Sequence, residues 1–126
     1  MDGARLYALV ALGGALGSMA RYATQSLAQA RLGVGFPWGT LAVNLVGAAL
    51  MGLLMGALAG RGSPTALFLG TGVLGGFTTY SAFNQEVLNL AMGGEAGKAA
   101  LYAGGTLLGA LLCGSACFAL GRTLSS

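Results

Sequence analysis

The sequence predicts an all-α integral membrane protein in which each chain contributes four transmembrane helices. Of its 126 residues, 56% are hydrophobic and only 7% are charged, whereas soluble domains carry about 25% charged residues. A soluble domain of this length leaves much of its surface in water, so a soluble Ala/Gly-rich helical protein is a poor alternative. The apolar character continues to the C-terminus, which argues against a cleaved signal peptide.

Four apolar segments are long enough to cross a bilayer, whose hydrocarbon core needs about 20 apolar residues per helix. We expect spans over about residues 4–30, 37–59, 64–92 and 96–121, which form a single transmembrane domain over residues 1–126. The connections RLGVGFP, GRGSP and GGEAGK each hold a charge and the Gly or Pro that starts or ends helices.

Four spans place both termini on one side of the membrane, and the basic residues barely distinguish the two sides. Arg5, Arg61 and Arg122 belong to the side of the termini, and Arg31 and Lys98 to the other. Because Lys and Arg set orientation, this weak bias predicts dual topology and an antiparallel homodimer. The alternative is that weaker signals select one orientation. The scattered charges form no nucleic-acid footprint.

The 24 glycines are spread through the spans. In lipid, small residues four apart let helix backbones approach closely, so we expect tight packing and oligomerisation. The pairs with this spacing are Gly13 and Gly17, Gly52 and Gly56, and Gly105 and Gly109.

Polar residues at membrane depth are costly and usually face a cavity or a partner. In the second span, Thr40 lies one turn before Asn44 on the same helix face. The amide either joins helices or lines a polar pathway, and the neighbouring hydroxyl favours the pathway. Tyr102 and Thr106 repeat this spacing in the fourth span, where Ala110 ends the polar stripe. Their alternative is hydroxyls that bond back to their own helix.

Two charged residues belong to the spans or their edges. Arg21 lies towards the end of the first span, where it either extends to the interface or draws anions towards an opening. Glu86 is the one carboxylate that we expect inside a span. It needs hydroxyl, amide or basic partners, or shallow water.

The third span contains GGFTTYSAFNQE, residues 75–86. Each glycine costs about 1 kcal/mol of helix stability relative to Ala, so we predict a helix broken near its middle, between Gly75 and Tyr80. Freed backbone groups at membrane depth must find protein, water or an ion, and unwound carbonyls can coordinate Na⁺. In an antiparallel dimer, the two breaks would meet on the two-fold axis.

Tyr80 and Phe83 share a helix face in this span. Their ring edges carry partial positive charge, which favours a small anion without any formal cation. The alternative is a pair of core aromatics in a bent helix.

The blocks GGALGSMARY, GTLAVNLVG and GGFTTYSAFNQE, with the spacing between them, resemble the fluoride channel family (Fluc/CrcB) over nearly the whole chain. The resemblance implies an antiparallel, dual-topology homodimer in the inner (plasma) membrane of a prokaryote. It also implies two pores that passively export fluoride from the cytoplasm and a structural Na⁺ at the dimer centre. The dimer as a whole would be surrounded by membrane lipid.

The resemblance also assigns roles to residues. Backbone carbonyls of Gly75 and Thr78 would hold the Na⁺, and Arg21 and Glu86 match positions near the vestibule or pore edge. The positions that match the fluoride pathway are Asn44, Tyr80, Ser81, Phe83, Tyr102 and Thr106, with Thr40 placed beside them by spacing. Three positions depart from the family pattern: Tyr80 replaces the commoner Phe, Ala82 stands where many members have Thr, and Ala110 lacks a third hydroxyl.

Other functions fit less well. A small proton-coupled multidrug exporter shares the length and weak charge bias but needs a carboxylate in the first span, and residues 4–30 contain none. A non-conducting assembly subunit would not need Asn44 together with the polar run of the third span. The sequence has no His and no nucleophile–base pair, so an enzyme is not expected.

Overall fold

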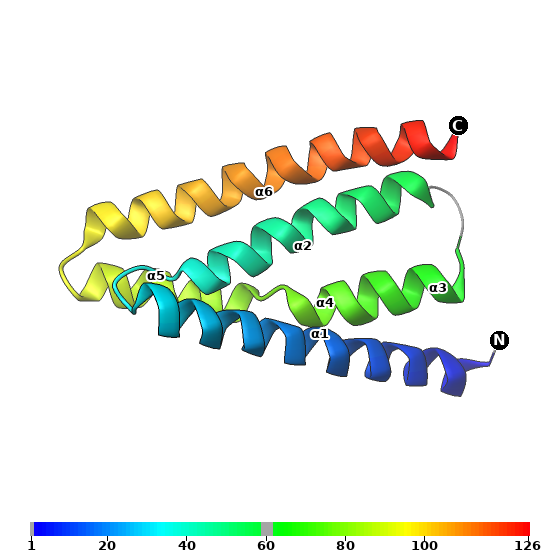
Figure 1. Ribbon diagram of the computed structural model, residues 1–126, viewed down its shortest axis with the longest axis horizontal. Helices are drawn as coiled ribbons and strands as arrows, with labels where there is room; N and C mark the ends of the chain where they lie inside the picture. Colours follow the sequence, from blue (N-terminus) through cyan, green and yellow to red (C-terminus); the bar gives the residue numbers. More distant parts are fainter. Residues whose placement is uncertain (1, 59–61) are drawn as a thin grey trace.

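Each of the four predicted spans forms a helical segment of the structure, a computed structural model that describes residues 2–58 and 62–126. Within these residues, four segments are long and apolar enough to cross a membrane: Gly3–Leu32, Trp38–Ala57, Pro64–Met92 and Ala96–Ser125. Both termini lie at one end of the bundle (Figure 1). The prediction of an all-helical protein with four spans is therefore confirmed, while Arg61, counted with the terminal side, lies outside the described residues.

Three spans are single helices, namely α1 (Gly3–Leu32), α2 (Trp38–Ala57) and α6 (Ala96–Ser125). The third span consists of α3 (Pro64–Ala66), the π-helical segment η1 (Leu67–Leu74), α4 (Gly75–Phe77) and α5 (Tyr80–Met92). The predicted start and stop residues act locally: Ser63 caps α3 with Pro64 at the first helical position, and Gly33 and Gly94 take positive φ values of 80° and 81° after helices.

The helices pack in two close pairs, α2 with α6 and α1 with η1 and α4 (Figure 1). Glycines bring the backbones together: a Cβ atom at Gly13 would lie 2.9 Å from the Cα of Gly72, and one at Gly52 would clash with the carbonyl of Gly114. Two of the three predicted glycine pairs therefore lie in helix contacts. Gly105 in the third pair has open space around its Cβ position within the chain.

Gly17→Ala is expected to destabilise the protein by about 1–3 kcal/mol, the usual cost of overpacking a tight contact. The new methyl group would clash with the carbonyl oxygen of Val73 and lie 2.8 Å from the Phe77 nitrogen. Gly14→Ala is the control, because its Cβ position is open within the chain. Unfolding in detergent measures both variants, and equal stabilities would contradict this account of the contact.

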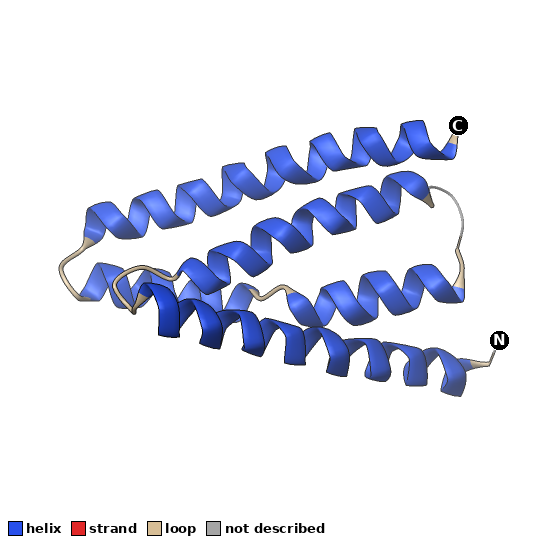
Figure 2. Ribbon diagram, in the orientation of Figure 1, coloured by secondary structure: helices blue, strands red, loops and turns tan. Residues whose placement is uncertain are grey.

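The third span is interrupted between α4 and α5, where Figure 2 shows a short loop. Thr78 (φ −81°, ψ 157°) and Thr79 (φ −149°, ψ 117°) are extended. The predicted break between Gly75 and Tyr80 is confirmed: it falls at Thr78 and Thr79, while Gly75 keeps helical angles of −62° and −38°. The propensity cost of one glycine is small and does not by itself unwind a helix that packs against neighbours.

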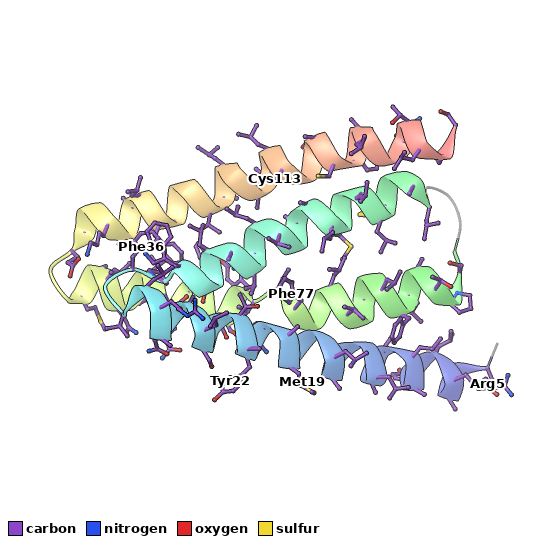
Figure 3. All side chains as sticks on the ribbon, viewed as in Figure 1. Arg5, Met19, Tyr22, Phe36, Phe77 and Cys113 are labelled. Carbon is purple, nitrogen blue, oxygen red and sulfur yellow. The ribbon has the colours of Figure 1, made fainter. Side chains whose placement is uncertain are left out.

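The outer surface of a single chain is largely apolar. Figure 3 shows Met19 and Tyr22 projecting outwards from α1, and their side chains are 66% and 71% exposed. By contrast, the largest fully buried side chains are Tyr102, Val43 and Thr40. Two of these three are polar, so the bundle turns lipid-compatible groups outwards and encloses hydroxyl groups.

Candidate functional site

Asn44 holds the break in the third span. Its Nδ2 donates to the carbonyl oxygen of Thr79 at 3.0 Å, and its Oδ1 accepts from the Thr79 N–H at 2.8 Å. Gly47 follows on α2, where a Cβ atom would clash with the methyl group of Thr78, so α2 lies close against the extended residues. Of the two alternatives for Asn44, helix joining is what its contacts show. The second hydrogen of Nδ2 leaves the pathway role a prediction.

Side chains divert the donors that would close the helix across this break. In an unbroken helix, the Thr79 N–H would donate to the Gly75 carbonyl and the Ala82 N–H to the Thr78 carbonyl. The Thr79 N–H instead donates to Asn44, and the Ala82 N–H donates to Thr79 Oγ1 at 3.1 Å. Gly75 and Thr78 therefore each present a carbonyl oxygen that has lost its helical donor.

Arg21 lies against the same break. Its Nε donates to the carbonyl oxygen of Gly76 at 3.1 Å, the oxygen that the Tyr80 N–H would reach in a continuous helix. A guanidinium at the C-terminal end of a helix segment is electrostatically favourable. This contact differs from both sequence-based interpretations, which placed the side chain at the interface or at an opening.

Glu86 is the centre of a hydrogen-bond network that joins four helices. Its Oε2 accepts from Thr40 Oγ1 at 2.9 Å, and its Oε1 accepts from the Tyr102 hydroxyl at 3.0 Å. Gln25 Nε2 donates to Thr40 Oγ1 at 3.0 Å. The predicted residues of α2, α5 and α6 thus meet at one carboxylate, and the alternative that Tyr102 bonds back to its own helix is wrong.

A row of aromatic rings runs beside this network. Tyr80 and Phe83 meet edge-on, with centroids 6.0 Å apart and an interplanar angle of 62°. The Phe83 ring is 5.2 Å from that of Tyr102, which in turn meets the edge of Phe36 at 5.4 Å. The shared face predicted for Tyr80 and Phe83 is therefore present, and it continues to α6 and to the loop before α2.

Two further hydroxyl groups complete the set of predicted polar residues. Thr106 Oγ1 is buried and has no hydrogen-bond partner among the residues that the structure describes, so it does not bond back to its helix. Ser81 is exposed, and its Oγ lies 3.4 Å from Thr79 Oγ1. An enclosed hydroxyl without a partner keeps its donor for a solvent molecule or an ion.

A cavity of about 610 Å³ opens beside the network, at the end of the bundle opposite the termini. Thr40, Glu86 and Gln25 line it together with Tyr22 and Asn89. Its wall combines the polar end of α1 with the loop before α2, so water and small ions reach the Glu86 network from this side. Arg21 does not line this cavity, although sequence reasoning placed it with Glu86 near a vestibule.

Three participants were missed by the sequence reasoning. Gln25 carried one signal, its position one turn after Arg21 on the same helix face. Thr79 precedes the second half of the broken span, and its hydroxyl caps α5. The one indication for Phe36 in the sequence is that it is an aromatic residue directly before Pro37, at a predicted helix start.

The chemistry available here is hydrogen-bond donation and carbonyl coordination. In residues 2–58 and 62–126, no three His, Cys, Asp or Glu side chains gather to hold a metal. Carbonyl oxygens are, however, suitable ligands for a hard monovalent cation. The hydroxyl, amide and ring-edge groups are suited to a small anion instead.

The chain resembles one family of known proteins over most of its length. A family model described as CrcB-like protein, Camphor Resistance (CrcB), matches residues 8–121. The fluoride-specific ion channel FluC of one strain of Thermus thermophilus is 52% identical over 123 residues, or 94% of this chain and 96% of the relative. FluC of Hyphomonas neptunium is 50% identical over 106 residues, or 81% and 84%. FluC 2 of Nitrobacter hamburgensis is 45% identical over 122 residues, or 94% and 98%.

Proposed function

The chain belongs to the CrcB-like family, and we propose that it is a passive, fluoride-selective channel that exports fluoride across the inner membrane of a prokaryote. Its relatives are named as fluoride-specific ion channels, which agrees with the expectation that it is not an enzyme. The finer features proposed below are an antiparallel dimer of dual topology, two pores and a central Na⁺.

The observation that carries the proposal is a break at mid-span that is half-buried and has exposed residues on both sides. Thr78 is the central residue of the span Pro64–Met92, and Gly75 and Tyr80 beside it are exposed on the single chain. Irregular backbone does not face lipid, because its polar groups would be unsatisfied. A second copy of the chain that covers this face would shield these polar backbone groups from lipid. Because the break lies at mid-depth, an inverted copy brings its own break to the same depth.

The residues at the break suit a cation between two such copies. Each chain offers the Gly75 and Thr78 carbonyls, so two chains offer four oxygens. When bound, Na⁺ would take the place of the N–H donors that these carbonyl oxygens have lost. Asn44 and Thr79 keep the Gly75 and Thr78 carbonyls available because their side chains accept from the Thr79 and Ala82 N–H groups. Arg21 donates to the neighbouring Gly76 carbonyl.

We assign the fluoride pathway of each chain to the polar and aromatic residues around Glu86. Fluoride enters the cavity and meets the hydroxyls of Thr40 and Tyr102, which now donate to the carboxylate. The edges of Phe83 and Tyr80 follow, with Ser81, Asn44 and Thr106 as further donors. Each copy has its own set of these groups, so a dimer has two equivalent pores.

Donors without a permanent positive charge suit conduction. A bare anion in a low-dielectric site costs on the order of 10 kcal/mol or more unless donors replace its water. Neutral hydroxyl, amide and ring-edge groups offset this cost, yet bind weakly enough for the ion to leave. Chloride is larger than fluoride, and we expect the spacing of these donors and the width of the passage between the rings to exclude it.

The deciding experiment measures halide efflux from proteoliposomes that contain the purified protein, with ion-selective electrodes for fluoride and chloride. We expect fluoride to leave down its gradient and chloride to remain. Protein-free liposomes are the control. Efflux of both halides would contradict the selectivity, and retention of both would contradict the channel itself.

Gly75→Ala separates contacts within the chain from contacts between copies. Among residues 2–58 and 62–126, a Cβ atom there meets only the Gly70 carbonyl, at 3.6 Å, which is an ordinary contact. We expect the chain to remain helical while the dimer weakens by about ten-fold in dissociation constant, because the methyl group would enter the face between the two breaks. Subunit exchange in detergent or lipid measures this change. An unaltered dimer would place the interface elsewhere.

A further inference from the structure

Gln25 is fixed opposite Thr40 by the packing of two helix backbones. A Cβ atom at Gly39 would lie 2.7 Å from the Cα of Gln25, so α1 and α2 touch here because residue 39 is glycine. The next residue on α2 is Thr40, and the half-buried Gln25 side chain reaches its hydroxyl. The Gln25–Thr40 bond is therefore built into a helix contact.

The ends of this hydrogen-bond chain determine its direction. The Gln25 amide nitrogen only donates, and an ionised Glu86 only accepts. Thr40 lies between them with a single hydroxyl hydrogen, so it accepts from Gln25 and donates to Glu86. The Thr40 side chain is 1% exposed, so Gln25 and Glu86 cover its hydroxyl group although the residue borders the cavity.

A threonine hydroxyl within a helix has a competing position. Its Oγ1 divides between two rotamers, and in one of them it bonds back to a carbonyl one turn earlier. Phe36, four residues before Thr40, lies outside α2 and its carbonyl accepts from the Trp38 N–H, so the candidate acceptor is the carbonyl of the N-cap residue Pro37, three residues before Thr40. The donor from Gln25 stabilises the rotamer in which the hydroxyl faces Glu86.

We propose that Gln25 is a positioning residue for fluoride conduction, which keeps the Thr40 hydroxyl aimed as a donor at the point where the cavity meets the Glu86 network. This inference rests on the proposed function, since it concerns the donors that receive fluoride. Gln25 acts through Thr40 and does not itself need to touch the ion. It has a role that the other polar residues at the end of α1 lack.

Gln25→Met tests this role because methionine keeps the length and loses the donor. We expect fluoride efflux to slow roughly three- to ten-fold, the range for one lost hydrogen bond. Thr24→Val is the control, since the adjacent Thr24 hydroxyl donates to the Ala20 carbonyl of its own helix, and its efflux is expected to stay within about two-fold of wild type. Gln25→Asn, whose amide is too short to reach, should slow efflux similarly.

A double-mutant cycle identifies the mechanism. If Gln25 acts through Thr40, then adding Gln25→Met to Thr40→Val slows efflux no further than Thr40→Val alone. Losses that multiply would overturn the positioning role, as would wild-type efflux in Gln25→Met and Gln25→Asn. Absence of fluoride efflux from the wild-type protein is a separate result, which would overturn the proposed function.

Discussion

Asn44→Leu is expected to abolish fluoride efflux and to lower the free energy of unfolding by about 2–4 kcal/mol. Leucine has a similar size but removes both hydrogen bonds to Thr79. Each bond lost leaves a backbone group unsatisfied in a half-buried position, at about 1–3 kcal/mol for a fully buried group. The freed Thr79 N–H is then available to the Gly75 carbonyl, so the break tends to close into a continuous helix.

The consequences of Asn44→Leu reach both proposed ion sites. Closing the break takes the Gly75 carbonyl from the cation and reorients α5, which carries both Tyr80 and Phe83, relative to Tyr102 on α6. Efflux assays and unfolding in detergent measure the two effects. Asn84→Leu, on the exposed side of α5, controls for the loss of an amide from the membrane domain. Normal efflux in Asn44→Leu would show that neither the break nor the pathway depends on this residue.

Local signals and hydropathy were enough to predict the spans. The third span was expected over residues 64–92 and forms Pro64–Met92, because Ser63-Pro64 and Gly93-Gly94 act through backbone geometry that needs no partner. The C-terminal end of α6 was less accurate: the helix begins at Ala96 as expected but continues to Ser125, beyond the expected residue 121. No Pro or strong capping residue near Gly121 stops it, and a chain terminus gives no composition signal.

The site was predicted as a set of residues but not as a set of contacts. Spacing placed Thr40 with Asn44 and Tyr102 with Thr106, because a helix face follows from its period. Which groups meet across helices depends on where the helices cross, and the periodicity of each helix does not contain this information. Gln25 and Glu86 reach Thr40 from helices 15 and 46 residues away in sequence. Similarly, the glycines predicted the break, but Asn44 and Thr79 determine its position.

Phe83→Ile is expected to reduce fluoride efflux by roughly a hundred-fold or more, or about 3 kcal/mol in the barrier. The Phe83 ring lies between Tyr80 and Tyr102, with centroid distances of 6.0 and 5.2 Å. Isoleucine fills much of the same space, so the dimer is expected to persist. It lacks the positive ring edge that would take the place of water around the anion.

Phe118→Ile provides the matched control, because Phe118 lies near the other end of α6 and is 36% exposed. This variant tests whether the loss of any aromatic ring impairs the channel. Size-exclusion chromatography establishes that both variants are dimers before efflux is compared. If Phe83→Ile conducts fluoride as fast as Phe118→Ile, ring edges do not stabilise the ion. Thr40, Tyr102 and Thr106 would then have to supply the donors alone, and the selectivity would depend on hydroxyl spacing.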